Sequence, residues 1–219
     1  GCAGRDFCEG SHEAILTMAR YQAKHGITTI CPATMTLPEK TLSTICEAAG
    51  SYDNREGAIL CGINMEGPFI SPAKKGAQCA DSIRKPDASM YHRLQEKSAN
   101  LIKLLAVAPE VEGALKFISE IKGEVTVSIA HTRADYDLSR KAFSCGASHV
   151  THLYNAMPPF SHREPGVIGA AFDTPNCEVE LICDGIHIHP SVVRSTFQLF
   201  GANRIIMISD SMMATGMPE

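Results

Sequence analysis

The sequence predicts an α/β fold with a parallel sheet, and within that class a (β/α)8 TIM barrel, on three observations. Short apolar runs alternate with segments of helical period along the chain. The runs are continuously apolar, which is typical of parallel strands buried on both faces. Side chains capable of metal binding or acid–base chemistry follow five of the runs. A barrel brings such strand ends together at one mouth, whereas a doubly wound sheet spreads them along an edge.

Seven apolar runs are predicted to be strands, at residues 27–33, 58–65, 101–108, 125–130, 149–153, 178–183 and 204–209. A doubly wound sheet would accommodate seven strands, but a barrel has eight. We therefore expect an eighth strand, the first of the barrel, to be missing from the start of the chain. The expected domain organisation is a single catalytic barrel over residues 1–219, incomplete, with seven of its eight strands visible.

Helices are predicted between the strands. Ser11 can cap the first helix, which buries Ile15 and Met18 and ends at Gly26. Residues 36–39 have the pattern of a capping box that opens a second helix ending at Gly50. Further helices are expected at residues 88–98, 111–121, 136–144 and 191–200, and the segment 156–170 is less regular.

Composition excludes two classes of partner. The chain has 219 residues, 44% of them apolar, which is enough to bury one sizeable core. No apolar run approaches the roughly 20 residues of a membrane span, so we expect a soluble protein. The net charge is −4 and the Lys and Arg residues are scattered, whereas a nucleic-acid partner normally requires a basic stripe. Small anionic ligands remain compatible with this charge pattern.

The nine cysteines predict a reducing compartment. None has the Cys-x-x-Cys spacing of a zinc ribbon or a thioredoxin-type site. Cys31, Cys61 and Cys183 lie in apolar runs and are expected to be buried, reduced thiols, which favours a cytoplasmic protein. The chain starts at Gly1 without a methionine and stops just after a predicted strand. We therefore expect it to be truncated at both ends.

Five strand ends carry the candidate chemistry: Glu66, His131, His152, Asp184 and Asp210 each end or follow a different apolar run. One carboxylate and two imidazoles suit a catalytic zinc ion, or a similar divalent ion, with one open coordination position. Such an ion lowers the pKa of a bound water to about 7. Asp210 would then be the nearby base that takes the proton of the water and returns it to the leaving nitrogen.

Six motifs occur in order along the chain: MEGPF at 65–69, AHT at 130–132, THLYNAM at 151–157, HREPG at 162–166, DGIH at 184–187 and SDS at 209–211. Together they closely resemble the N-acetylglucosamine-6-phosphate deacetylase family of the amidohydrolase superfamily. The resemblance runs the whole length of the chain, and its most specific part is the succession of HLYNAM, HREPG and DGIH. It implies hydrolysis of the acetamide of N-acetyl-D-glucosamine 6-phosphate to D-glucosamine 6-phosphate and acetate, in amino-sugar catabolism.

The resemblance also implies roles for particular residues. Glu66, His131 and His152 would bind the principal divalent metal, most readily zinc and otherwise iron, manganese or cobalt, and Asp210 would be the catalytic acid–base. Arg163 would reach across a homodimer interface to the phosphate in the neighbouring site, a task that suits the donor fork of a guanidinium. The sugar-phosphate pocket would be lined by Ala77, Gln78, Asn155, Ala156, Arg163, Asp184, Gly185, Ile186 and His187.

The sequence departs from the family in two ways. Some members have a histidine in place of Gln78 and use it to polarise the acetyl carbonyl, and the Gln78 amide could donate the same hydrogen bond. The family's His-x-His pair, which precedes a glycine matching Gly1, and its small β-sandwich domain are expected to be missing, together with some substrate contacts beyond position 219.

Two alternatives stay open. The first is another amidohydrolase, a cyclic amidase or a deaminase, against which the HREPG and HLYNAM motifs argue. The second is a non-enzymatic sugar-phosphate sensor or an inactive fragment that binds sugar phosphate. The intact set of Glu66, His131, His152 and Asp210 disfavours a degenerate sensor.

Overall fold

The computed structural model describes residues 1–218 and divides them into two compact units. The first comprises Gly1–Gly67, Asp87–Leu104 and the described residues from Ser211 on, and the second comprises Pro68–Pro86 and Leu105–Asp210. Strands β3 (Ile63–Phe69) and β4 (Ile102–Val107) each pass from the first unit into the second. Within residues 1–218, no helix is both long enough and apolar enough to span a membrane.

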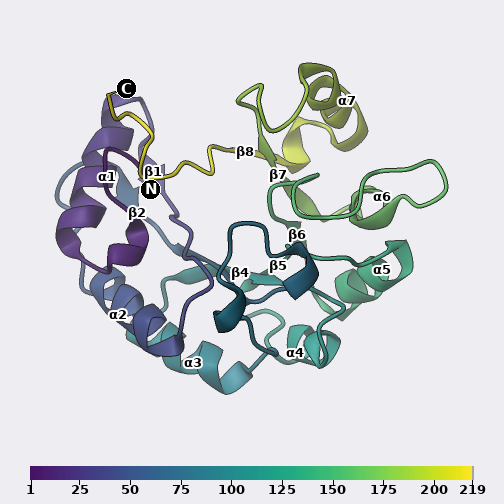
Figure 1. The fold of residues 1–219 in the computed structure, drawn as a ribbon, viewed down its shortest axis with the longest axis horizontal. Coiled ribbons are helices and arrows are strands. Elements are labelled where there is room, and N and C mark those ends of the chain that lie inside the picture. Colours follow the sequence, from purple (N-terminus) through teal and green to yellow (C-terminus); the bar gives the residue numbers. More distant parts are fainter. Residues whose placement is uncertain (219) are drawn as a thin grey trace. The chain divides into compact units, whose positions relative to one another are not determined.

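The first unit contains a two-stranded sheet and three helices. Strand β1 (Thr29–Ile30) pairs in parallel with β2 (Ile59–Leu60). Helix α1 (His12–Lys24) begins at the predicted cap, because the Ser11 hydroxyl accepts a hydrogen bond from the main-chain N–H of Ala14 at 3.2 Å. Helices α2 (Glu39–Gly50) and α3 (Ala88–Lys97) also lie where they are predicted (Figure 1).

The predicted capping box before α2 is wrong. The helix begins at Glu39, and its N-cap residue is Pro38, which makes no side-chain capping hydrogen bond. Thr36 is instead completely buried, and its hydroxyl donates to the main-chain oxygen of Glu66 at 3.4 Å. A buried hydroxyl needs an acceptor for its proton, and the main-chain oxygen of Glu66 in strand β3 provides it.

A six-stranded sheet runs through the remaining strands in chain order, β3-β4-β5-β6-β7-β8 (Figure 1). Its later strands are β5 (Thr126–Ile129), β6 (His149–Val150), β7 (Glu178–Ile182) and β8 (Ile205–Ile208), and they pair in parallel. The connecting helices are α4 (Ala114–Glu120), α5 (Tyr136–Cys145), α6 (Gly166–Phe172) and α7 (Pro190–Phe200). Repeated strand–helix–strand units of this kind give the predicted α/β class.

All seven predicted strand regions contain strands, but two of them are much shorter than predicted: β1 covers only Thr29–Ile30 and β6 only His149–Val150. The region 58–65 is two strands, β2 and β3, and β3 continues to Phe69. Glu66 therefore lies inside a strand instead of following one. The less regular segment 156–170 includes the start of α6.

The sequence predicts strands that are buried on both faces. This prediction is confirmed for the central strands and is wrong for β1, β2 and β8. Every residue of β3 is buried, whereas Met207 on β8 is 71% exposed. Strand β8 ends the strand order of the described sheet, so it has a paired neighbour on one side alone. The expected burial of three thiols is also wrong, because Cys31, Cys61 and Cys183 are exposed. Side chains alternate along a strand, and Cys61 points away from the face on which Leu60 is buried.

Candidate metal centre

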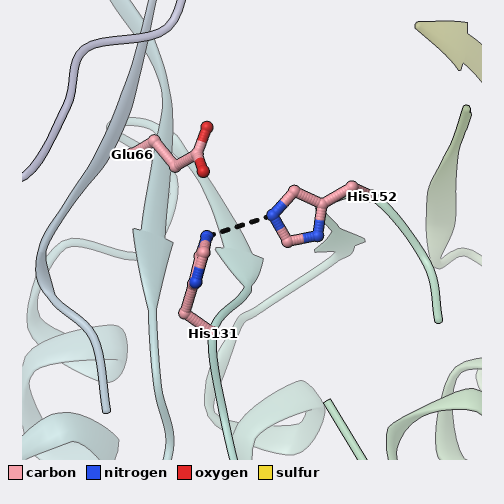
Figure 2. Close-up of side chains that lie close together, drawn as sticks. All are labelled: Glu66, His131 and His152. Atoms are coloured by element: carbon pink, nitrogen blue, oxygen red, sulfur yellow. Dashed lines mark hydrogen bonds between the residues drawn. The ribbon is translucent and has the colours of Figure 1, made fainter. Parts of the chain in front are cut away.

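Three buried side chains from three strand regions of the six-stranded sheet lie close together. Glu66 lies in β3, His131 follows β5 and His152 follows β6. One ligand atom from each lies within 4.8 Å of the other two. Figure 2 shows the carboxylate and both imidazole rings directed toward one another. Of the five strand-end residues that the sequence leads us to expect at one place, these three form the group of possible metal ligands.

The ring of His131 is oriented by the loop that follows β3. Its Nδ1 atom lies 2.9 Å from the main-chain oxygen of Lys74. A carbonyl oxygen can only accept, so Nδ1 carries the proton in this hydrogen bond. The Nε2 atom of the neutral ring then presents a lone pair toward the other two ligand residues. Metal-binding histidines commonly have this second hydrogen bond, which fixes the tautomer of the ring.

The two imidazole rings lie edge to face. Their Nε2 atoms are 3.1 Å apart, and the ring planes make an angle of 81° (Figure 2). Two ring nitrogens and one carboxylate, all buried, form a donor set that would suit a divalent ion such as zinc. The residues present therefore fit a catalytic metal.

The backbone at both histidines is left-handed, with φ of 44° at His131 and 32° at His152. Asp210 has the same feature, with φ of 47°. Residues other than glycine adopt this conformation at a cost of about 1–3 kcal/mol, and it concentrates at functional sites. In each case the chain turns sharply after a parallel strand, and the turning residue is one of the candidate site residues.

A carboxylate from a neighbouring strand end holds the loop after His131. Glu110 accepts from the main-chain N–H of Arg133 at 2.6 Å and from the hydroxyl of Thr132. The main-chain N–H of Thr132 in turn donates to the oxygen of Ala156 at 3.1 Å. This last bond joins the loop after β5 to the loop after β6, which are the two loops that carry the histidines.

Residues of the expected sugar-phosphate pocket lie on three loops. The side chain of Gln78 is buried and Ala77 is exposed, and Gly76 in the same loop lies beside the ring of His131. The Asn155 amide donates at 3.3 Å to each of two main-chain oxygens of its own turn. Arg163 is exposed on the segment before α6.

Asp184 organises the loop after β7. Its carboxylate accepts from the main-chain N–H groups of Ile186 and His187, both at 2.9 Å, and from Nδ1 of His187 at 2.7 Å. These hydrogen bonds lower the pKa of Asp184 to about 2. The stretch from Asp184 to His187, including Gly185, is exposed. Asp210 is also exposed, two residues after β8, and is not among the three clustered ligand residues.

Sequence reasoning missed the residues that support the histidines. The carbonyl of Lys74 belongs to the main chain, so residue type gives no signal for it. Glu110 had a usable signal, because it is a carboxylate that follows a strand in the same way as the chosen residues. Glu110 belongs to none of the six motifs.

A parallel α/β sheet with a Glu–His–His group at its strand ends is the arrangement of a metal-dependent hydrolase. The model of the amidohydrolase family matches residues 7–216. The chain belongs to the amidohydrolase family.

Three similar proteins within this family are named as deacetylases of N-acetylated sugar phosphates. The chain is 38% identical over its whole length to an N-acetylglucosamine-6-phosphate deacetylase of Bacillus subtilis, covering 57% of that protein. It is 33% identical to an N-acetylgalactosamine-6-phosphate deacetylase of Escherichia coli, covering 59% of it. It also resembles a mutant N-acetyl-D-glucosamine-6-phosphate deacetylase of Mycobacterium smegmatis, solved in complex with N-acetyl-D-glucosamine-6-phosphate. The TM-score of this match is 0.91 and the sequence identity is 31%. The match covers all of this chain and 57% of the Mycobacterium smegmatis chain.

The chain thus spans somewhat over half the length of the relatives it matches. The close structural match confirms the fold class predicted from the sequence, the metal-dependent hydrolase type of α/β barrel.

Proposed function

We propose that the protein hydrolyses the acetamide of N-acetyl-D-glucosamine 6-phosphate, giving D-glucosamine 6-phosphate and acetate in amino-sugar catabolism. The observation that carries the proposal is the buried convergence of Glu66, His131 and His152 in a member of the amidohydrolase family. The names of the relatives add the substrate class.

The three clustered residues would hold the divalent ion, for which we propose zinc; iron, manganese and cobalt accept the same nitrogen and oxygen donors. When bound, such an ion polarises a carbonyl and makes a nucleophile available from water at neutral pH. The proposed role of the chain's own groups begins with tautomer control. The Lys74 carbonyl keeps the proton of His131 on Nδ1, so that Nε2 stays available as a ligand.

Asp210 is the proposed catalytic acid–base. Its carboxylate would accept a proton from the attacking water and deliver it to the sugar nitrogen as the carbon–nitrogen bond breaks, so that the amine leaves neutral. The exposure of Asp210 at the end of β8 is compatible with access to a substrate. The buried Gln78 amide would donate a hydrogen bond to the acetyl oxygen.

Sugar-phosphate recognition is assigned to polar and small residues of the surrounding loops. The proposed contacts are Ala77, Gln78, Asn155, Ala156, Arg163, Asp184, Gly185, Ile186 and His187. Arg163 would bind the phosphate in the site of a second copy, and its exposure is compatible with that role. We also propose a homodimer, a single catalytic domain, and a cytoplasmic location, which suits the nine free cysteines.

The test is an assay of acetate release by the full chain, run beside metal analysis. N-Acetyl-D-glucosamine 6-phosphate should be hydrolysed with the highest kcat/KM, and the galactosamine epimer is included because one relative is named for it. Hydantoin, dihydropyrimidine and adenosine test the cyclic amidase and deaminase alternatives. Turnover of one of these without turnover of either sugar phosphate would refute the proposal, and turnover of none would favour the inactive fragment.

A matched pair of histidine variants ties the activity to the site. His131→Gln should lose bound metal and activity together. His92→Gln, on the exposed surface of α3, should keep both. Equal activity in the two variants would remove the clustered histidines from the mechanism.

A further inference from the structure

A row of buried polar side chains lies next to His152 within the sheet. The hydroxyl of Ser128 is 2.7 Å from the hydroxyl of Thr151 and 2.8 Å from Nδ1 of His149. The Nε2 atom of His149 lies 3.8 Å from Oε1 of Glu180 on β7. All of these residues are buried. Burying polar groups is costly unless they are paired, so a connected row of this kind needs an explanation.

The row ends on the main chain of His152. The second carboxylate oxygen of Glu180, Oε2, accepts a hydrogen bond from the main-chain N–H of His152 at 3.2 Å. The main-chain oxygen of Glu180 accepts from the N–H of Leu153 at 2.8 Å. One residue of β7 therefore binds two consecutive N–H groups of the turn that carries the metal ligand, one through its side chain and one through its backbone.

The local backbone explains why a side chain is needed there. The N–H of Thr151 still pairs with the main-chain oxygen of Ile129, which follows the ladder between β5 and β6. At His152 the φ angle becomes +32° and the chain leaves the ladder. Its buried N–H group then finds its acceptor in the Glu180 side chain, and a strained conformation persists where surrounding groups hold it.

We propose that Glu180 is a positioning residue for the proposed metal ligand His152, acting through the ligand's main-chain N–H. This inference rests on the proposed metal site and adds a residue that the sequence motifs do not include. The Nε2 atom of His149 lies 3.8 Å from the other oxygen of the Glu180 carboxylate. Ser128 holds the ring of His149 through its Nδ1 atom, and Thr151 in turn holds the hydroxyl of Ser128. The buried row thus holds the turn, and the turn aims the imidazole of His152 at Glu66 and His131.

Three variants of the full chain separate this role from general stability. Glu180→Gln keeps a carbonyl acceptor for the His152 N–H. Glu180→Leu removes the acceptor, and the double variant His149→Leu/Glu180→Leu also removes the buried histidine that lies next to the carboxylate. Replacing both buried partners by apolar groups is often tolerated, so the double variant keeps the test informative if the single one fails to fold. Glu178→Leu, an exposed position on the same strand, is the matched control.

Cobalt affinity and the visible spectrum of the cobalt-loaded protein are the first readout. Loss of support for a metal ligand typically weakens metal binding 10–100-fold. We expect such a loss and an altered spectrum in both Leu variants, and a change of no more than a few fold in Glu180→Gln and Glu178→Leu. Unchanged affinity and spectrum in the Leu variants would overturn the inference, as would a loss in Glu180→Gln equal to that in Glu180→Leu.

Hydrogen exchange of the metal-free protein is the second readout and does not depend on the proposed function. The amide of His152 should exchange faster in the Leu variants than in the parent chain or in Glu178→Leu. If the parent chain binds no cobalt, the metal-site proposal fails, and the exchange data still decide whether Glu180 holds the turn. Equal exchange in all variants would refute that role directly.

Discussion

The hydroxyl of Thr36 occupies the space that a side chain at position 67 would need. Gly67 has a φ of 101°, and a Cβ atom built there would collide with Thr36 Oγ1 and lie 3.1 Å from its Cβ. Gly67 directly follows Glu66, and the same Thr36 hydroxyl donates to the Glu66 main-chain oxygen. The glycine of the MEGPF motif therefore lets strand β3 pass close to Thr36 with the carboxylate ligand in place.

Gly67→Ala should lower the free energy of unfolding by roughly 3 kcal/mol, from backbone strain together with overpacking. Gly113→Ala is the matched control, because Gly113 has a φ of 85° but nothing within 4 Å of its built Cβ. The control should lose only the strain, about 1 kcal/mol. Urea unfolding measures both. Adding Thr36→Ala to Gly67→Ala should recover part of the loss, and equal losses in the two single variants would contradict the steric account.

Asp210→Asn should abolish deacetylation while leaving metal bound. Removing a general acid–base lowers the rate by typically 10²–10⁴-fold. Asp210 is not among the three clustered ligand residues, so the metal content should match that of the parent chain. Glu66→Gln, by contrast, should lose metal and activity together. Acetate release and metal analysis on the same preparations test this, and near-normal turnover in Asp210→Asn would remove Asp210 from the mechanism.

Stability should fall on mild acidification because of His149. Burial lowers the pKa of His149 to about 4, below its ordinary 6.5, so this histidine is neutral near pH 7 and forms no ion pair with Glu180 there. Between these two pKa values the unfolded chain binds more protons than the folded one, so the free energy of unfolding decreases as pH falls through the window. The contribution of this group is roughly 3 kcal/mol at most. The free energy of unfolding, measured with urea near pH 7 and near pH 4, should differ less between the two pH values in His149→Gln than in the parent chain. An equal difference in both proteins would show that His149 is not the cause.

Arg204→Lys should destabilise the region where α6 ends. The Arg204 guanidinium donates to the main-chain oxygens of Cys177 at 2.9 Å, Phe172 at 3.3 Å and Thr174 at 3.0 Å, and also to that of Ala171. An ammonium group cannot reproduce this planar fork of donors. We expect a loss of about 2 kcal/mol in thermal or urea unfolding. Arg194→Lys, on the exposed side of α7, should be neutral by comparison, and an equal loss there would contradict the prediction.

Apolar runs mark the buried parallel strands, so the sequence predicted the strands and the approach of the five residues that end or follow them. The resemblance to the deacetylase family then selected Glu66, His131 and His152 as metal ligands. What the sequence could not predict depends on tertiary neighbours. Thr36 matched a capping pattern but is bound by a strand, and the exposure of Cys61 depends on which face of its strand is covered.

The residues that support the two histidines, Lys74 and Glu180, could not be predicted for a related reason. The Lys74 carbonyl acts through the backbone, which no residue-type pattern reveals. Glu180 lies within an apolar run, where a single carboxylate looks like an interruption of a strand until its hydrogen bond to His152 is seen.

The order of the strands determines when the metal centre can come into existence. Because each strand of the six lies beside the next one in the chain, the sheet can grow one strand at a time from its amino-terminal side. The ligands arrive with β3, β5 and β6, so an ion cannot be bound by all three until four consecutive strands are joined. Metal binding would then stabilise strands that have already paired and would not nucleate their pairing. Its binding energy would slow the unfolding of the sheet and would do little to speed its formation.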